Sequence, residues 1–418
     1  MDKIVLKQAG AVGHVAKNHQ FWSDNVVLGF SALLVGVFNY LYHVVLAHVL
    51  GPHKYGDLTT FLNVTSFLVM PASVVVLIYT RLGKRPRSAG QRDAWWLWGI
   101  GVVSWAAIWV FAGPLSRTFH VSQLLLIIFT AEVVPSLALA ANTGILQNAR
   151  RYLLVGALAV LNGLFRVVAA SSALWPVYRL VVVGGLEGAA AWVTWVVSRR
   201  MVRTVPVQEE ATGFGMVTAT GVVAVINVLY AIVDGLAAKY ALPPEIAGQY
   251  TGMAIMGHSI DFVSGSLATV MLTAMLSDPS HRYSYLGLTV AVYGLLAGLA
   301  QWIFIAHGAR LVIMILGPRF LAIAPWLPSY DWGMIGLGLL NIAMFYSIAQ
   351  SRWEVITTTG CGLLVWTWTL VHDHTLRAFT LSTAHILVAT VAATAVVMGV
   401  TLVVSGYGRV GREGPEVP

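Results

Sequence analysis

The sequence contains few charged residues for its length. Only 10% of its 418 residues are Asp, Glu, Lys or Arg, whereas 58% are hydrophobic and the mean hydropathy is +0.77. A soluble domain carries about a quarter charged residues. This composition excludes a water-soluble enzyme and a disordered chain. It predicts an all-α integral membrane protein, and at about 20 residues for each spanning helix the chain accommodates roughly twelve spans.

Other features that the sequence lacks narrow the function. The single cysteine, Cys361, excludes a disulfide scaffold and a cysteine metal cluster. The ATP-binding pattern GxxxxGK[S/T] does not occur, so ATP is not expected to be the direct energy source. We therefore predict no catalytic residue, no metal site and no cofactor. Residues 1–20 lack an apolar core of signal-peptide length and are expected to form a cytoplasmic lead, amphipathic or disordered.

Apolar runs bounded by charged residues, Gly or Pro predict the spans. They lie at 25–50, 58–80, 94–112, 121–146, 152–174, 180–198, 214–238, 250–276, 286–306, 329–350, 355–371 and 379–405. The run 311–328 is interrupted by Gly-Pro-Arg and is expected to be a connection on the outer face. If the N-terminus is inside, 17 of the 25 Lys and Arg residues face inward, 7 face outward and Arg166 lies within a span. This bias predicts a multi-pass protein with both termini in the cytoplasm.

The chain is expected to consist of two similar halves. The polar stretch 199–213 lies near its middle, which predicts six-helix bundles at 1–203 and 214–418 joined by a cytoplasmic linker at 204–213. LGPHKYGDLT at 50–59 and LPPEIAGQYT at 242–251 each follow the first span of a half. At an offset of 192 they match at Leu50 and Leu242, Pro52 and Pro244, Gly56 and Gly248, and Thr59 and Thr251. Repeats of equal helix number are typical of transporters that alternate access.

Four stretches resemble a known family of transporters. FNYLYHVVLAHVLGPHKYGDLTTF resembles the first hairpin of polysaccharide flippases of the O-antigen and capsule type, within the multidrug/oligosaccharidyl-lipid/polysaccharide exporter superfamily. YAIVDGLAAKYALPPEIAGQY, ILGPRFLAIAPWL and ILQNARRY resemble later parts of the same family. The resemblance implies a V-shaped pair of bundles around a central polar cavity. It also implies export of an undecaprenyl-pyrophosphate-linked oligosaccharide across the bacterial cytoplasmic membrane, beside polymerases and glycosyltransferases of one pathway.

The first two spans depart from the related lipid II flippases. Those proteins place arginines inside both spans, whereas here the first span has no cation and Arg81 lies only at the inner end of the second. A phosphate site must therefore use other cations, of which Arg81 and Lys239 are candidates.

Ionisable groups at membrane depth are the candidates for function, because they are costly there, and three lie in the first half. Arg166 shares a helix face with Asn162, and its forked guanidinium suits a pyrophosphate. The alternative is a structural ion pair with Glu132 or Glu187. Pro135 is expected to kink the helix one turn after Glu132, which makes Glu132 a candidate proton or sodium site as well. Glu187 has the same two interpretations, as half of an ion pair or as a functional group of the cavity.

The second half carries two further polar stripes. Asn227, Tyr230 and Asp234 share one face of a helix, and His258 and Asp261 are three residues apart on the next. A carboxylate beside a histidine can exchange a proton near neutral pH. Hydrogen bonding between helices explains both stripes equally well. The coupling ion is thus H⁺ or Na⁺, with Glu132, Asp234, His258 and Asp261 as candidates.

These observations favour a transporter of a lipid-linked oligosaccharide, with membrane lipid and no nucleic acid as partner. One alternative is a multispan glycosyltransferase, polymerase or ligase of the same pathway, which would need a sizeable acidic or basic outer loop that the sequence lacks. Another is an exporter of small molecules from the same superfamily, which would need a smaller and more apolar pocket.

Overall fold

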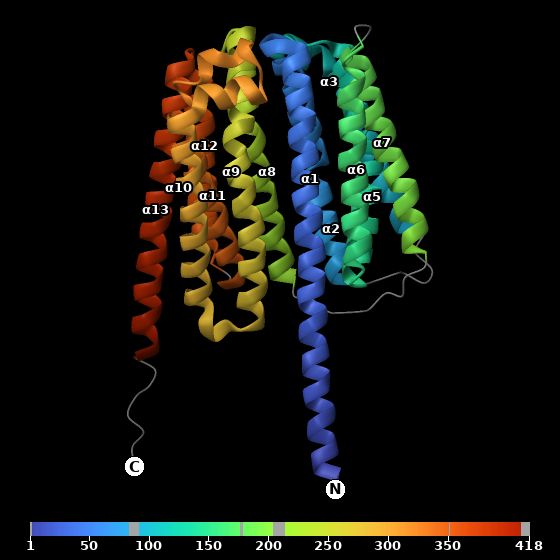
Figure 1. Ribbon diagram of the computed structural model, residues 1–418, viewed down its shortest axis with the longest axis vertical. Helices are drawn as coiled ribbons and strands as arrows, with labels where there is room; N and C mark the ends of the chain where they lie inside the picture. The colour runs from blue at the N-terminus through green and yellow to red at the C-terminus, as the bar shows by residue number, and fades with distance from the viewer. Residues whose placement is uncertain (1, 83–91, 176–178, 204–213, 351, 411–418) are drawn as a thin grey trace. The chain divides into compact units, whose positions relative to one another are not determined.

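The computed structural model describes residues 2–82, 92–175, 179–203, 214–350 and 352–410. Within these ranges every regular element is helical (Figure 1). The α-helices are α1 (Asp2–Val69), α2 (Pro71–Leu82), α3 (Arg92–Phe119), α4 (Gln123–Thr130), α5 (Val133–Asn148), α6 (Tyr152–Ser172), α7 (Arg179–Val202), α8 (Phe214–Ala241), α9 (Pro244–Ser277), α10 (Arg282–Ile315), α11 (Leu327–Gln350), α12 (Trp353–His372) and α13 (Leu376–Val410). Two short 3₁₀ turns, η1 (Pro279–His281) and η2 (Pro318–Ile323), flank α10.

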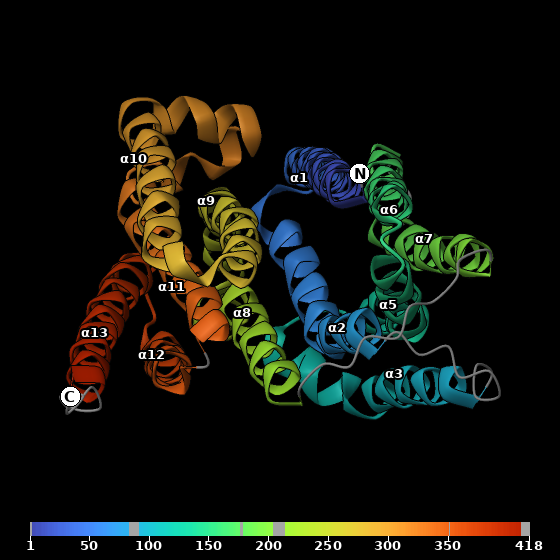
Figure 2. The ribbon, with the colours of Figure 1, turned by 90° about the horizontal axis from the view of Figure 1, so that it is seen from below.

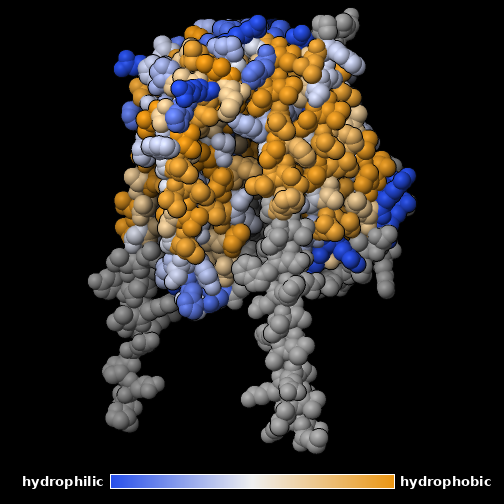
Figure 3. Space-filling model, in the orientation of Figure 1, coloured by the Kyte–Doolittle hydropathy of each residue, from blue (hydrophilic) through white to orange (hydrophobic). Residues whose placement is uncertain are grey.

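Eleven stretches of the described helices are long and apolar enough to cross a membrane. The first, Leu33–Val76, has 44 residues, about twice the length that one span needs. Because α1 is kinked at Gly51, this stretch accommodates two spans, and the total agrees with the twelve predicted. Large hydrophobic side chains such as Leu295 and Leu364 are exposed, and Figure 3 shows such residues over wide areas of the surface, as lipid contact requires.

The predicted spans differ from the helices at two places. The second span is interrupted at Met70, between α1 and α2, and the span predicted at 121–146 is divided into α4 and α5. The N-terminal lead is helical, since α1 begins at Asp2. The connection expected at 311–328 is confirmed in outline, because α10 ends at Ile315 and η2 follows.

The helices form two compact units. Unit 1 comprises Met1–Val45, Pro71–Phe111 and Leu124–Thr212, and within it α2 packs on α5, and α7 packs on both α5 and α6. In unit 2, α11 contacts α8, α9, α10, α12 and α13, and the view in Figure 2 shows it among them. Unit 2 contains Gly213–Pro418, but also Leu46–Met70 and Ala112–Gln123. The predicted linker, 204–213, lies outside the described residues.

The kink in α1 depends on a glycine. Gly51 has φ +70°, a conformation that side chains with a Cβ rarely adopt, and Pro52 follows it. The same Leu-Gly-Pro order recurs at 316–318, where Gly317 has φ +96°. A Cβ on Gly51 would lie 3.0 Å from the guanidinium of Arg319, so the two turns pack together in unit 2.

The two stretches predicted to be repeats make matching contacts. The Thr59 hydroxyl donates to the Gly56 carbonyl at 3.0 Å, and the Thr251 hydroxyl donates to the Gly248 carbonyl at the same distance. Gly56 and Gly248 also pack against each other, since a Cβ on Gly56 would lie 2.9 Å from Gly248 Cα. Equivalent positions of the two stretches therefore meet within unit 2.

Replacement of Gly248 by Ala should test this contact. The added methyl would overlap the carbonyl oxygen of Pro52, so we expect the free energy of unfolding to fall by about 1–3 kcal/mol. Gly298→Ala on α10 is the matched control, because no atom lies within 4 Å of its new Cβ and helix propensity alone should leave it neutral or slightly stabilising. Equal stability of the two variants in reversible detergent unfolding would contradict the contact.

Candidate functional site

In unit 1 an arginine is held at membrane depth by α1 and α7. Arg166, on α6, donates from Nη1 to Asn39 Oδ1 at 2.9 Å, and its Nε lies 3.6 Å from Glu187 Oε1. Its guanidinium also lies 5.3 Å from the centre of the Tyr42 ring. The structure thus brings together Arg166 and Glu187, one of the pairs that the sequence allows. The amide that bonds the guanidinium is Asn39 of α1, whereas Asn162 lies on the same helix as Arg166, α6.

The hydrogen-bonding capacity of the Arg166 guanidinium is only partly used in this cluster. At 3.6 Å the Arg166–Glu187 contact is an ion pair rather than a hydrogen bond. The Glu187 carboxylate is 2% exposed and also interacts with the Tyr42 hydroxyl. Arg166 makes one hydrogen bond to the described residues, and its side chain is 28% exposed. Its guanidinium therefore retains N–H donors that are available to a ligand or to water.

Glu132 lies next to this cluster, at a break in the helix. Pro135 has no N–H to continue the helical bonding and its ring crowds the carbonyl of Ala131, which explains why α4 and α5 separate at 131–132. The backbone carbonyl of Glu132 instead accepts from the Ser136 hydroxyl at 2.6 Å. Glu132 is close enough to interact electrostatically with Arg166 and Glu187, so one cation faces two acids.

In unit 2 an aspartate is surrounded by donors. Asp234 on α8 is 1% exposed, and its carboxylate accepts from Tyr330 at 2.7 Å, from its neighbouring backbone N–H at 2.7 Å and from Tyr250 at 3.3 Å. His258 Nε2 lies 3.4 Å away. The sequence places Asp234 and His258 on separate stripes, and the structure joins them through α9 and α11.

The remaining residues of the two stripes bond to neighbouring helices. Asn227 donates to Asn341 at 3.1 Å, and Asn341 donates to Ser264 at 3.0 Å. The Ser264 hydroxyl approaches the Asp261 carboxylate at 3.2 Å, so Asp261 belongs to this second network. Tyr230 bonds the Thr359 carbonyl at 2.8 Å. These bonds agree with the alternative explanation of the stripes, which is hydrogen bonding between helices.

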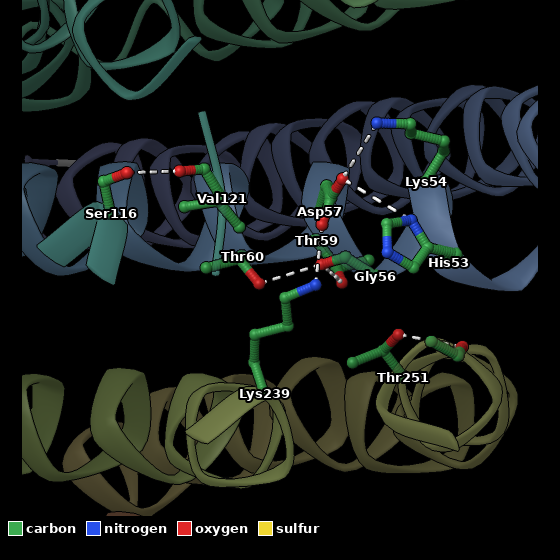
Figure 4. A network of polar contacts seen from close by, with 11 residues as sticks. His53, Lys54, Gly56, Asp57, Thr59, Thr60, Ser116, Val121, Lys239 and Thr251 are labelled. Atoms are coloured by element: carbon green, nitrogen blue, oxygen red, sulfur yellow. Dashed lines mark hydrogen bonds and ion pairs between the residues drawn. The ribbon is translucent and has the colours of Figure 1, made fainter. Parts of the chain in front are cut away.

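Lys239 is enclosed in an ion pair. Its Nζ lies 2.6 Å from Asp57 Oδ1, and both residues are buried (Figure 4). His53 and Lys54 lie on the other side of the same carboxylate, at 3.9 and 3.6 Å. Lys239 therefore secures the stretch after the α1 kink to α8. The side chain of Arg81 lies outside what the structure describes.

Some buried polar residues have no counterpart in the predicted site. Asn39, Tyr42, Asp57 and Tyr330 contact the candidate residues, and the only signal for Asn39 is that it is an amide well inside an apolar run. Asp331 is fully buried and neither carboxylate oxygen has a hydrogen-bond partner in the described part of the chain. Nowhere in that part do three His, Cys, Asp or Glu residues converge as metal ligands would.

Comparison with solved structures gives the class of fold. The chain is similar to the lipid II flippase MurJ in an inward closed conformation (TM-score 0.69, 10% identity, 88% of this chain and 86% of that one). It is also similar to an inward-facing multidrug resistance MATE transporter of the MOP superfamily (0.65, 10%, 92% and 99%). A eukaryotic MATE transporter, AtDTX14, matches at 0.62 and 11% identity over 90% and 96%.

The sequence itself matches no protein-family model and no curated protein. The identities of 10–11% therefore speak for the fold alone. The chain has the helical fold of MOP superfamily transporters, and the proteins it resembles in structure are transporters rather than enzymes.

A double substitution tests whether the Arg166–Glu187 pair stabilises the protein. Arg166→Ala leaves Glu187 buried without its cation, so we expect a loss of about 3–5 kcal/mol in stability. Adding Glu187→Gln removes the uncompensated charge and should recover most of that loss. Arg377→Ala, an exposed arginine, is the control. A cost for Arg166→Ala no larger than that of Arg377→Ala in detergent unfolding would show that the pair does not stabilise the protein.

Proposed function

We propose that the protein is a secondary transporter that moves a polyprenyl-pyrophosphate-linked oligosaccharide from the inner to the outer leaflet, for the synthesis of cell-surface polysaccharide. The observation that carries the proposal is the incompletely paired Arg166 inside unit 1. The guanidinium has five N–H donors, and one of them donates a hydrogen bond to a described residue, Asn39. The others suit a pyrophosphate, which a guanidinium binds through parallel hydrogen bonds.

The likeness to MurJ supports a lipid-linked substrate. MurJ is a flippase for lipid II, and it shares the fold over most of both chains. In the proposed cycle the charged headgroup enters the protein while the polyprenyl tail stays in lipid. Burial of the headgroup phosphates without a cation would be prohibitive in a low-dielectric interior, so a pre-positioned arginine lowers the main barrier.

Cation coupling is proposed at acids of both units. Glu132 lies beside an arginine already facing Glu187, so its charge state affects how tightly the arginine is held. Asp234 and His258 form a second exchangeable pair. Movement of H⁺ or Na⁺ through one of these sites would drive the cycle. The two bundles, 1–203 and 214–418, are proposed as products of a duplication, which the matching Gly56 and Gly248 contacts support.

A flipping assay tests the function directly. The purified protein is placed in liposomes that carry a fluorescent polyprenyl-pyrophosphate oligosaccharide, and exposure of the sugar to an external lectin is followed. We expect faster exposure than in empty liposomes, and loss of that activity in Arg166→Ala/Glu187→Gln. Asp278→Asn, in an exposed turn between α9 and η1, should behave as wild type.

The same liposomes distinguish the two alternatives, an exporter of small molecules and an enzyme of the pathway. If the labelled lipid stays inside while a small cationic dye exchanges across the membrane, the protein is an exporter of small molecules. If neither moves but the glycan is lengthened when a sugar donor is added, the protein is an enzyme of the pathway. Either result would replace the proposed function.

Topology is a further prediction of the proposal. In a Cys361→Ser background, a cysteine at Arg203 should react with a reagent that reaches only the cytoplasm, and a cysteine at Glu245 only with an external reagent. Both positions are exposed. External labelling at position 203 would invert the orientation and contradict a cytoplasmic location of both termini.

A further inference from the structure

Three tryptophans form a contiguous aromatic surface in unit 1. Trp98 of α3 stacks on Trp192 of α7, with ring centres 5.2 Å apart and planes inclined by 30°. Trp98 also meets Trp195 edge to face at 4.8 Å, and Trp192 meets Trp195 at 6.0 Å. Each indole therefore touches the other two, which fixes their positions more firmly than isolated interfacial tryptophans.

An arginine extends this surface at the end of α7, and a second arginine follows it in the sequence. The guanidinium of Arg199 lies 5.5 Å from the centre of the Trp195 ring, a cation–π distance. Trp192, Trp195 and Arg199 follow the three- and four-residue spacing that aligns side chains on one helix face. Arg200 follows directly, and both arginines are exposed. We call these five residues the tryptophan–arginine patch.

The charge of the patch is not neutralised by described parts of the protein. No carboxylate of the described residues lies within ion-pair distance of Arg199 or Arg200, whereas Arg166 of the same unit has Glu187. Beside the patch, α7 presents Val193 and Val196, which are 44% and 42% exposed. An apolar face thus ends in two cations that have no carboxylate partner among the described residues.

We propose that the tryptophan–arginine patch binds one anionic phospholipid of the surrounding bilayer. Arg199 and Arg200 hold the headgroup phosphate and its net negative charge. The indoles and the valines lie against the glycerol region and the upper acyl chain. Aromatic residues prefer this depth, and basic residues at the ends of spans attract anionic lipids. The proposal is independent of the transported substrate, which concerns Arg166.

A lipid bound at this patch would contact both α3 and α7, and so would affect how the two helices pack. The two helices are far apart in sequence, and the three indoles bridge them. A lipid seated on the bridge would stabilise this pairing of helices. Binding should therefore raise the thermal stability of the protein as well as its lipid occupancy.

Native mass spectrometry and thermal unfolding of the full chain test the proposal. The protein in neutral detergent is titrated with phosphatidylglycerol, with phosphatidylcholine and with free glycerol phosphate. Wild type should bind phosphatidylglycerol in preference and gain stability from it alone. Arg199→Gln/Arg200→Gln should weaken that binding by roughly thirtyfold, from about 1 kcal/mol for each basic residue.

The control variant is Arg150→Gln/Arg151→Gln. It removes the same charge from exposed arginines at the α5–α6 turn, which have no indole contact among the described residues. It should keep most of the affinity. An equal loss of phosphatidylglycerol affinity in both variants would show that diffuse surface charge explains the binding, and would overturn the proposal. Equal binding of phosphatidylcholine, or stabilisation by free glycerol phosphate, would also overturn it.

Trp192→Phe/Trp195→Phe provides a second measurement that retains the charge. We expect weaker phosphatidylglycerol binding with unchanged stability in the absence of lipid, because phenylalanine keeps the apolar contact but loses the indole N–H and part of the cation–π attraction. Unchanged affinity would remove the tryptophans from the site.

Discussion

The structure depends on how charges are accommodated in a medium that does not solvate them. A membrane interior makes every unpaired ion expensive, so each ionisable group inside the protein must find a partner there. Lys239 and Asp57 meet this condition with a contact of 2.6 Å, and Asp234 meets it with donors from three directions. Arg166 and Glu187 meet it only partly, at 3.6 Å. In the proposed function, this difference separates groups that hold helices together from a group positioned to receive a charged ligand.

Close backbone contact supports the same arrangement. Gly56 and Gly248 let the stretch after the α1 kink lie directly against α9, with the Asp57–Lys239 pair beside them. The contact relates equivalent positions of two similar stretches, and the proposed duplication would account for a glycine at both positions. The kink at Gly51 begins this arrangement, because only a residue without a side chain readily turns the chain there.

Much of the fold was predictable from hydrophobic runs alone. Apolar length determines spans directly, which is why twelve were expected, and the Pro135 signal correctly indicates the break between α4 and α5. The groups that bond each buried charge were less predictable. Helix periodicity places Asn162 near Arg166, but only tertiary packing brings Asn39 from α1 to its guanidinium. Similarly, nothing local to Lys239 indicates that Asp57, 182 residues away, neutralises it. The helix carrying Arg81 is described, but not the side chain that was a candidate.

The proposed function requires Arg166 to recognise a pyrophosphate through its forked donors. The most direct measurement is the affinity of the purified protein for undecaprenyl pyrophosphate, compared with undecaprenol, in wild type and Arg166→Lys. Lysine keeps the charge and loses the fork. We therefore expect wild type to prefer the pyrophosphate, and Arg166→Lys to weaken that binding about tenfold or more without changing the affinity for undecaprenol. Equal binding of the pyrophosphate by the two proteins would contradict the claim.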